Sequence, residues 1–436
     1  SNIDGLPKNT WVSCIETSAF DSNTAFVTFD GHREGDMNSY LYKTEDLGKT
    51  WTSLADTNIK GHCHVIRQDP VNPDLLFLGT EFGLYMSIDG GDHWLRFSGN
   101  VPKVSVRDMQ IQERENDLVI GTHGRGIMII DDITPIHKLK PGMLDQELVY
   151  LGSRPYQIGY LGYEQGWTGD DEFAGPNPPG SVNITYYLKK RHIFGDMFIE
   201  VYDPEGKMIK KLPAGKRKGI NRVQWQMRKD PPKVPSSVQI LGQAFTGPAY
   251  PPGEYTIKIH KGENIYEGEV KIEYDPNLPH SKEDRDLRLK ALMKTYDLLE
   301  ELAFIDAKLL DLLKQLNAKK SETDQENLKT ELNEMSEELM EFRKGLLATR
   351  EGRITGEKRL RERLGKIYGD VMGYQGRPTD SQIQRLQNLD DKVMEVNSKL
   401  AQLIQEQLEL INQKLRETSI PEINLISRKK FEEEAN

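Results

Sequence analysis

The chain has 436 residues, of which 36% are hydrophobic and 29% charged, and its formal net charge is −10 at pH 7. This length predicts about two to four domains, and the negative charge argues against non-specific binding to nucleic acid. We find no run of about 18 apolar residues, so we expect no transmembrane helix.

A repeated turn motif organises residues 1–135. Thr44–Trp51 reads TEDLGKTW and Ser87–Trp94 reads SIDGGDHW, so both fit Ser/Thr-x-Asp-x-Gly-x-x-Trp. The distance along the sequence between the two copies of the motif is typical of four-stranded propeller blades. Short β-branched runs bounded by Gly, Asn, Asp and Pro fit the strands of such blades. We predict the last two to three blades of a propeller here. The third segment lacks the Gly and Trp of the motif, as expected of a final blade.

The conspicuous residues of this Asp-box motif are predicted to be structural. An Asp carboxylate can accept backbone N–H groups across a tight turn, and a Gly permits a positive φ. A Trp at the end of the turn can pack between neighbouring sheets. The residues with this predicted role are Asp46, Gly48, Trp51, Asp89, Gly91 and Trp94.

The motif also predicts which side of the blades carries a ligand. In a meander blade the first and third turns share one side, so the loops at 30–38, 81–83 and 123–126 should lie on the opposite side. Two interpretations stay open: a face for polar recognition or acid–base chemistry, or a set of solvated turns. The candidate ligand-face residues are His32, Arg33, Glu34, Asp36, Glu81, His123 and Arg125. We assign no catalytic residue, no metal site and no cofactor.

Four stretches resemble the bacterial BNR/Asp-box repeat proteins with sortilin-type propellers, often labelled "glycosyl hydrolase, BNR repeat". They read YLYKTEDLGKTW, DPVNPDLLFLGTEFGLYMSIDGGDHW, VRDMQI and GTHGRGIMIIDDITP. The resemblance implies that earlier blades of the same propeller lie upstream and that the protein is extracellular or periplasmic. It also implies glycan chemistry, but it brings no catalytic set onto residues of this chain.

Residues 136–180 are rich in Gly, Pro and Tyr and are predicted to be a linker. The aromatic residues of this segment either pack against neighbours or form a ligand platform. Three adjacent carboxylates at 170–172 form either a solvated loop or a site for a hard cation. The aromatic residues are Tyr150, Tyr156, Tyr160, Tyr163 and Trp167.

Residues 181–276 alternate apolar and polar residues in about seven short runs, which predicts an immunoglobulin- or fibronectin-III-like β-sandwich. Asp203–Gly206 reads as the turn of a hairpin. Trp225 is the expected aromatic residue of the core. The resemblance extends here through the motifs NPPG, GINRV and PPGEY, and such sandwiches usually act as spacers or interaction modules.

Residues 280–420 predict an antiparallel helical bundle, because Leu and Ile recur at three- and four-residue steps. Ser281 is a plausible start of the first helix. Capping boxes are predicted at 323–326 and 379–382, the second opening a long helix to about Thr418. A shorter helix is expected at 356–369, and 421–436 form a tail. An exposed apolar stripe would permit self-association.

The sequence thus predicts a multidomain, mainly β plus α protein with partial β-propeller blades, an immunoglobulin/fibronectin-III-like β-sandwich and a C-terminal helical bundle. The favoured function is a binding module for an unknown glycan or protein ligand, without a complete active site. The alternative is part of a sialidase-like, exo-acting glycoside hydrolase whose site lies mainly upstream. Cys14 and Cys63 are expected as buried thiols, with a bridge left open. The blades with an open edge should pack on another copy or another part of the chain, or be poorly ordered.

Overall fold

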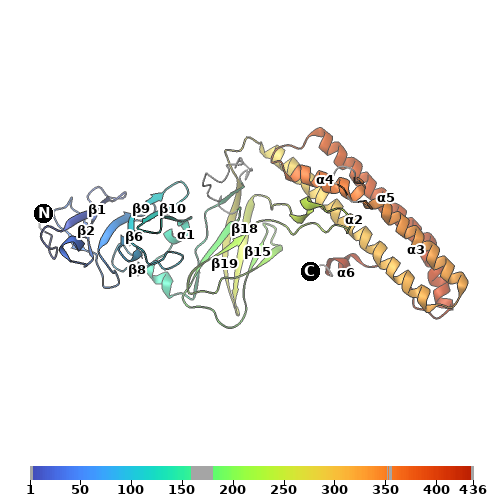
Figure 1. The fold of residues 1–436 in the computed structure, drawn as a ribbon, viewed down its shortest axis with the longest axis horizontal. Helices are drawn as coiled ribbons and strands as arrows, with labels where there is room; N and C mark the ends of the chain where they lie inside the picture. Colours follow the sequence, from blue (N-terminus) through green and yellow to red (C-terminus); the bar gives the residue numbers. More distant parts are fainter. Residues whose placement is uncertain (1–2, 159–179, 351, 353–355, 434–436) are drawn as a thin grey trace. The chain divides into compact units, whose positions relative to one another are not determined.

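The computed structural model describes residues 3–158, 180–350, 352 and 356–433 (Figure 1). They fall into two units, each described by itself below. The first comprises 1–157, 177–226 and 252–273, and the second comprises 158–176, 227–251 and 274–436.

Three antiparallel sheets occupy the N-terminal part of the first unit, and we call them the first, second and third repeat sheets. Their strands pair in chain order, as a meander predicts. The first contains β1 (Trp11–Thr17), β2 (Ala25–Asp30), β3 (Tyr40–Thr44) and β4 (Thr52–Ser53). The second contains β5 (Cys63–Gln68), β6 (Leu76–Thr80), β7 (Gly83–Ser87) and β8 (Leu95–Arg96). The third contains β9 (Val106–Gln112), β10 (Asp117–Thr122) and β11 (Ile127–Ile130).

The two motif turns join the third strand of a repeat sheet to the fourth. Each lies against the first turn of its own sheet: the backbone N–H of Leu47 donates to the Asn23 carbonyl at 3.1 Å, and that of Gly90 donates to the Asp74 carbonyl at 2.9 Å. We call this side of the sheets the turn side. The loops that join second and third strands therefore lie at the opposite end, which we call the loop side.

Inside each motif turn the Asp carboxylate caps the backbone, as the sequence predicts. Asp46 Oδ1 accepts from the Thr50 N–H at 2.8 Å, and Asp89 Oδ1 accepts from the His93 N–H at 3.0 Å. Gly91 has φ 104°, a region that side chains rarely adopt. A Cβ there would also lie 2.7 Å from a Leu54 methyl group, so the turn requires glycine.

The two motif tryptophans are buried to different degrees. Trp94 is fully buried in the core shared by the first and second repeat sheets, and its Nε1–H donates to the Leu54 carbonyl at 2.9 Å. Trp51 is half-buried and packs against a smaller cluster around Phe29 and Tyr42. Trp94 is therefore the stronger link between neighbouring sheets.

Two edges of the repeat sheets expose large apolar side chains. Trp11 and Ile15 of β1 are 63% and 65% exposed. Ile127 and Ile129 of β11 are 74% and 56% exposed, and β11 is the edge strand of a sheet with three strands in the described part of the chain. Both edges offer apolar surface to whatever packs there.

Two further antiparallel sheets complete the first unit. After the short helices α1 (Thr134–His137) and η2 (Pro141–Asp145) the chain forms strands β12 to β19. One sheet has the order β12-β14-β17, from Leu148–Tyr150, Val182–Leu188 and Gly219–Trp225. The other has the order β13-β19-β18-β15-β16, from Tyr156–Ile158, Asn264–Tyr274, Gly253–Lys261, Met197–Tyr202 and Met208–Pro213.

The details of these two sheets agree with several expectations. Asp203–Gly206 closes the β15–β16 hairpin through the Gly206 N–H, which donates to the Asp203 carbonyl at 2.9 Å. Trp225 is 1% exposed and meets Tyr255 edge-on, with 5.2 Å between ring centroids. Part of the predicted linker is ordered as β12 and β13. Tyr160, Tyr163, Trp167 and the carboxylates at 170–172 lie outside the described residues.

Helices that share one hydrophobic core dominate the second unit (Figure 1). They are α2 (Lys282–Glu322), α3 (Glu326–Leu346), α4 (Leu360–Met372) and α5 (Asp380–Glu417), preceded by the short η3 (Gly242–Phe245) and followed by the short α6 (Arg428–Glu433). No helix among the described residues combines the length and the apolar character needed to cross a membrane.

Two of the three predicted helix starts are capped by the expected side chain, and one is not. Ser281 accepts from the Asp284 N–H at 3.1 Å, and Thr379 forms a complete capping box with Gln382. The predicted capping box at Thr323 is wrong. Gln325 is the N-cap of α3 and forms no side-chain cap bond. Because α2 continues to Glu322, Thr323 is its C-cap, with its N–H bonded to the Lys319 carbonyl.

Candidate functional site

A β-bulge interrupts the first strand of each repeat sheet, near the loop side. Strand pairing skips Ser13 in β1, His64 in β5 and Arg107 in β9. These three strands are neighbours in space. Bulges bend a strand and re-aim the extra side chain. The bulges therefore bring equivalent positions of three repeats, occupied by a hydroxyl, an imidazole and a guanidinium group, to the same side.

Carboxylates arrive at the same place from the second strands. Asp30 ends β2 opposite Trp11, and Glu81 directly follows β6, whose Thr80 pairs with Cys63. In antiparallel pairs the end of one strand meets the start of the next. The resulting group, which we call the His–carboxylate cluster, consists of Asp30, His32, His62, His64, Glu81, Ser105 and Arg107.

Glu81 connects the second repeat sheet to the third. Its Oε2 accepts from Ser105 Oγ at 2.9 Å and from Arg107 Nη2 at 3.3 Å, and His64 Nε2 lies 3.0 Å away. The guanidinium group is 45% exposed and Glu81 is 29% exposed. The cluster is therefore anchored in the fold but open to solvent at Arg107.

Asp30 connects the first repeat sheet to the same cluster. Its Oδ1 accepts from the backbone N–H of His32 at 2.9 Å, and His32 Nδ1 lies 2.7 Å from the same oxygen. The His32 ring stacks on His62 at 4.8 Å between centroids, and His62 meets His64 edge-on at 4.7 Å. Three imidazoles are thus in contact in series.

His62 is the least satisfied member of the cluster. It is 3% exposed, and its Nδ1 has no hydrogen-bond partner. Its Nε2 lies 3.6 Å from Glu81 Oε2 and 3.9 Å from Asp30 Oδ1, beyond hydrogen-bond distance from both. A buried imidazole held between two carboxylates without a hydrogen bond calls for a physical explanation.

The pKa shifts in the cluster favour neutral forms of His62 and His64 and ionised forms of Asp30 and Glu81. Burial lowers the pKa of His62 and of His64. Burial alone would raise the pKa of Glu81, but hydrogen bonds from His64 and Ser105 and the Arg107 charge lower it overall. Burial acts on Asp30 in the same way, and the bonds from His32 lower its pKa overall. The cluster carries two carboxylate charges against one guanidinium charge.

The structure brings together only part of the predicted ligand face. His32 and Glu81 belong to the cluster. The guanidinium of Arg33 lies 5.3 Å from the centroid of the Trp11 ring. Asp36 accepts from Tyr40 Oη at 2.7 Å and from the Asn38 N–H at 3.0 Å, so it stabilises its own loop.

The remaining predicted residues stay outside the cluster. Glu34 and Arg125 are exposed, and no hydrogen bond or ion pair links their side chains to the described residues of the cluster. His123 is also exposed and reaches the cluster only through its backbone N–H, which donates to the Ser105 carbonyl at 2.9 Å.

Sequence reasoning missed Asp30, His62, His64, Ser105 and Arg107 as site residues. Asp30 opened the predicted loop 30–38 but was not selected. A signal existed for the histidines: His62 and His64 are two residues apart at the start of a strand, a spacing that places both side chains on one face. The contribution of Arg107 depends on the bulge, which the sequence does not reveal.

The same cluster contains a group with the composition of a metal site. One ligand atom each from Asp30, His62 and His64 can be chosen so that all lie within 4.8 Å of one another. Imidazole and carboxylate donors together suit divalent transition metals.

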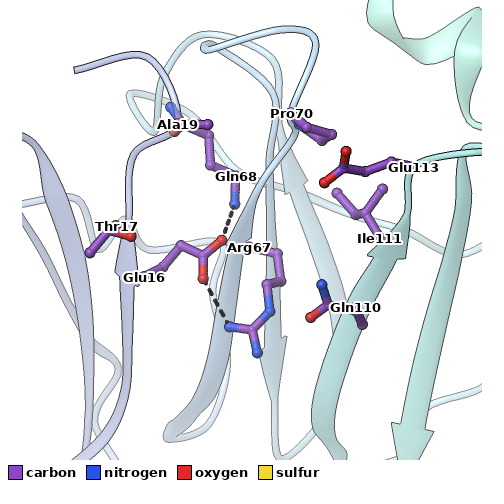
Figure 2. A pocket seen from close by; sticks show the side chains of 9 residues that line it. All are labelled: Glu16, Thr17, Ala19, Arg67, Gln68, Pro70, Gln110, Ile111 and Glu113. Atoms are coloured by element: carbon purple, nitrogen blue, oxygen red, sulfur yellow. Dashed lines mark hydrogen bonds and ion pairs between the residues drawn. The ribbon is translucent and has the colours of Figure 1, made fainter. Parts of the chain in front are cut away.

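A pocket of about 130 Å³ lies on the turn side, at the far ends of the same strands (Figure 2). Glu16 lines it and accepts from Arg67 Nη1 at 3.2 Å. Burial raises the pKa of Glu16 in spite of this guanidinium group. The other residues that line the pocket are Thr17, Ala19, Gln68, Pro70, Gln110, Ile111 and Glu113.

Arg67 also ties the three repeat sheets together. Its Nε–H donates to the Met109 carbonyl at 2.8 Å, and its Nη2 lies 3.2 Å from Asp108 Oδ1, both in β9. Its Nη1 lies 3.2 Å from Cys14 Sγ in β1. Cys14 and Cys63 are free thiols, Cys14 half-buried and Cys63 fully buried.

No protein-family model and no curated protein matches the chain. Among solved structures, an ancestral GH74 enzyme is 17% identical over 26% of this chain and 14% of its own length, with a TM-score of 0.23. The GH74 xyloglucanase from Xanthomonas campestris is 12% identical over 64% of this chain and 40% of its own, with a TM-score of 0.24. YCF48 from Cyanidioschyzon merolae is 13% identical over 61% of this chain and 73% of its own, with a TM-score of 0.20. Likenesses this distant carry no conclusion about the present chain.

Proposed function

We propose that this chain is part of a propeller-type binding protein and that the His–carboxylate cluster marks its ligand face. The three repeat sheets are blades in this proposal. The observation that carries it is the convergence of Asp30, His64, Glu81 and Arg107 from three repeats onto one exposed side. The motif carboxylates on the other side, by contrast, are occupied by bonds within their own turns.

The chemistry of this face favours an oligosaccharide ligand. Ionised carboxylates accept hydrogen bonds from hydroxyl groups, and imidazoles both accept and donate them. Arg107 adds an exposed donor. Trp11 pairs with Asp30 across β1 and β2 and is 63% exposed, so an aromatic surface adjoins the cluster. An apolar ring beside a few convergent polar groups is typical of small-molecule sites.

In this proposal the remaining parts of the chain hold the propeller blades in place or space them from other domains. The sheets formed by β12 to β19 act as an immunoglobulin- or fibronectin-III-like sandwich, and α2 to α5 act as a helical bundle for interaction or spacing. The protein works outside the cytoplasm, in the extracellular space or the periplasm, and upstream blades complete the propeller.

A glycan array tests the proposal. The untagged 436-residue chain should bind a subset of oligosaccharides, and Arg107→Ala should reduce that binding by at least about tenfold if the lost hydrogen bond is charge-assisted. His123→Ala is the matched control, because its side chain is exposed on the same side but outside the cluster. Binding of a peptide library instead would keep the ligand face and change the ligand class. No binding, or equal binding by both variants, contradicts the proposal.

A glycoside hydrolase is the second candidate, and the pocket on the turn side favours it. Burial raises the pKa of Glu16, as a general acid requires, and Glu113 supplies a second carboxyl group to the same pocket. In this case the chain should release sugar from a panel of glycans that includes sialosides. Glu16→Gln should abolish turnover, and Glu45→Gln, an exposed glutamate outside the pocket, should not.

A further inference from the structure

We propose that Asp30, His62 and His64 form a binding site for one divalent transition metal ion of the Zn²⁺ class. The inference deepens the proposed function, because it names a cofactor for the same ligand face and rests on that face being functional. Three donors of two kinds, two imidazoles and one carboxylate, form the set. Zn²⁺ sites that bind substrate or ligand use three protein donors and leave a fourth position open.

The separations between donor atoms suit an ion of this size. A tetrahedral ion with bonds of about 2.0–2.1 Å keeps its ligand atoms roughly 3.3 Å apart. His62 Nε2 lies 3.9 Å from Asp30 Oδ1 and 3.6 Å from Glu81 Oε2. Only the first distance joins two residues of the set, and the three donor atoms lie within 4.8 Å of one another. Side-chain rotations that draw these atoms closer together would place them on one ion.

The environment of His62 gives the second observation. Its ring is 3% exposed, and its Nδ1 is buried without a hydrogen-bond partner among the described residues, while its Nε2 lies beyond hydrogen-bond distance of both neighbouring carboxylates. A polar group buried in this way costs about 1–3 kcal/mol when it has no partner. A metal ion bound through Nδ1 of His62 would remove this cost, whereas a purely structural role for His62 leaves it unexplained.

The surroundings provide the partners that metal ligands usually have. His32 Nδ1 lies 2.7 Å from Asp30 Oδ1 and orients that carboxylate. Such outer partners fix ligand geometry and tune affinity. Glu81 lies 3.0 Å from His64 Nε2 and also bonds Ser105 and Arg107, so it can hold the Nε2–H of a His64 that binds the ion through Nδ1.

The site is also accessible from solvent. Arg107, which adjoins the cluster through Glu81, is 45% exposed, and the His32 side chain is 42% exposed. An ion and a small ligand can therefore reach the open coordination position. A hydroxyl or carboxylate group of an oligosaccharide would occupy this position, with Arg107 as the adjoining donor.

Calorimetric titration tests the site directly. The untagged chain, treated with chelator and dialysed, is titrated with ZnCl₂ alone and then with CoCl₂ while the visible spectrum is recorded. We expect one ion per chain and the absorption bands of tetrahedral cobalt. His62→Ala and His64→Ala should weaken binding by at least about 100-fold, and His32→Gln, as an outer partner, by about 10-fold. His123→Ala should bind as the wild type does.

The wild-type titration decides the outcome even if a variant fails to fold. Absence of Zn²⁺ and Co²⁺ binding by the wild-type chain overturns the inference, as does unchanged binding by folded His62→Ala. A cobalt spectrum with thiolate charge-transfer bands assigns the ion to a cysteine and also overturns it.

The glycan array, repeated with and without chelator, separates the two proposals. Metal binding without any glycan or peptide binding contradicts the proposed function alone. Glycan binding that depends on Arg107, by a wild-type chain that binds neither Zn²⁺ nor Co²⁺, contradicts the metal site alone.

Discussion

The two ends of the repeat sheets use the same residue types in opposite ways. On the turn side, Asp46 and Asp89 bond to groups within four residues of themselves. On the loop side, Glu81 bonds to partners 17, 24 and 26 residues away. The local bonds saturate the carboxylate and build a turn. The long-range bonds assemble a cluster and leave His62 Nδ1 without a partner among the described residues, and it is this cluster to which we assign ligand binding in our proposal.

Replacement of Trp94 is expected to change the free energy of unfolding most. It tests whether the turn side is purely structural. Its side chain is fully buried and its Nε1–H bonds to the Leu54 and Gly91 carbonyls. Trp94→Ala should lower the free energy of unfolding by about 3–5 kcal/mol, measured by urea denaturation. Where the variant still folds, its Zn²⁺ affinity should equal that of the wild type. Trp51→Ala, from a half-buried site, should cost less, and an equal cost would contradict the ranking.

Arg67 gives the next largest effect, because it links all three repeat sheets from the turn side. Arg67→Met keeps much of the side-chain volume but removes the guanidinium donor of the Met109 carbonyl and of Glu16 Oε2, while Glu16 Oε1 keeps its bond from the Gln68 N–H. We expect a loss of about 2–3 kcal/mol, the range for buried groups deprived of a charged partner. Arg114→Met, at a guanidinium that is 81% exposed, is the control and should stay within about 0.5 kcal/mol.

Asp46 gives a smaller, pH-dependent effect. The hydrogen bond from the Thr50 N–H is the main cause that lowers the pKa of Asp46 from 3.8 to about 2. Because the folded-state pKa lies below the unfolded one, the stabilisation is present above about pH 4 and is lost as the pH falls towards 2. Asp46→Asn should melt a few degrees below the wild type at pH 7, and scanning calorimetry should show the gap closing in that window. A gap independent of pH would contradict this assignment, and Glu45→Gln should show no gap.

The smallest effect is expected at two residues that the sequence placed on the ligand face but the fold leaves outside the cluster. His123→Ala and Arg125→Ala remove exposed side chains, so each should change the free energy of unfolding by less than about 0.5 kcal/mol. Both should retain Zn²⁺ and glycan binding. Loss of Zn²⁺ binding or of glycan binding in these variants would show that the site extends across the third repeat sheet, beyond the His–carboxylate cluster.

Features encoded within a few residues were predictable from the sequence. The turn at 203–206, the capping box at Thr379 and the turn carboxylates are all formed by neighbours along the chain. The capping box at Thr323 failed because α2 extends far enough to make this residue its own C-cap. Local sequence patterns therefore predict local structure correctly unless packing over many residues shifts the end of a helix or strand.

The candidate site was predictable only in its location. The loop side follows from the order of strands in a meander, and two of the residues selected from the sequence, His32 and Glu81, lie in the cluster. The partners of Glu81 were not, because Ser105 and Arg107 meet it through the pairing of different sheets and through a bulge. Register irregularities of one residue have no reliable sequence signal, yet here they determine which side chains meet.

Cys63 lies in sequence between His62 and His64 and belongs to the hydrophobic core. It is fully buried, and burial raises the pKa of its thiol to about 12. Burial and the raised pKa together predict slow reaction of the thiol with alkylating reagents at neutral pH. Labelling of Cys63 can occur only when the start of β5 opens, which moves His62 and His64 at the same time. The rate of Cys63 alkylation therefore reports how often the site opens. A bound ion or ligand that holds His62 and His64 in place should lower this rate.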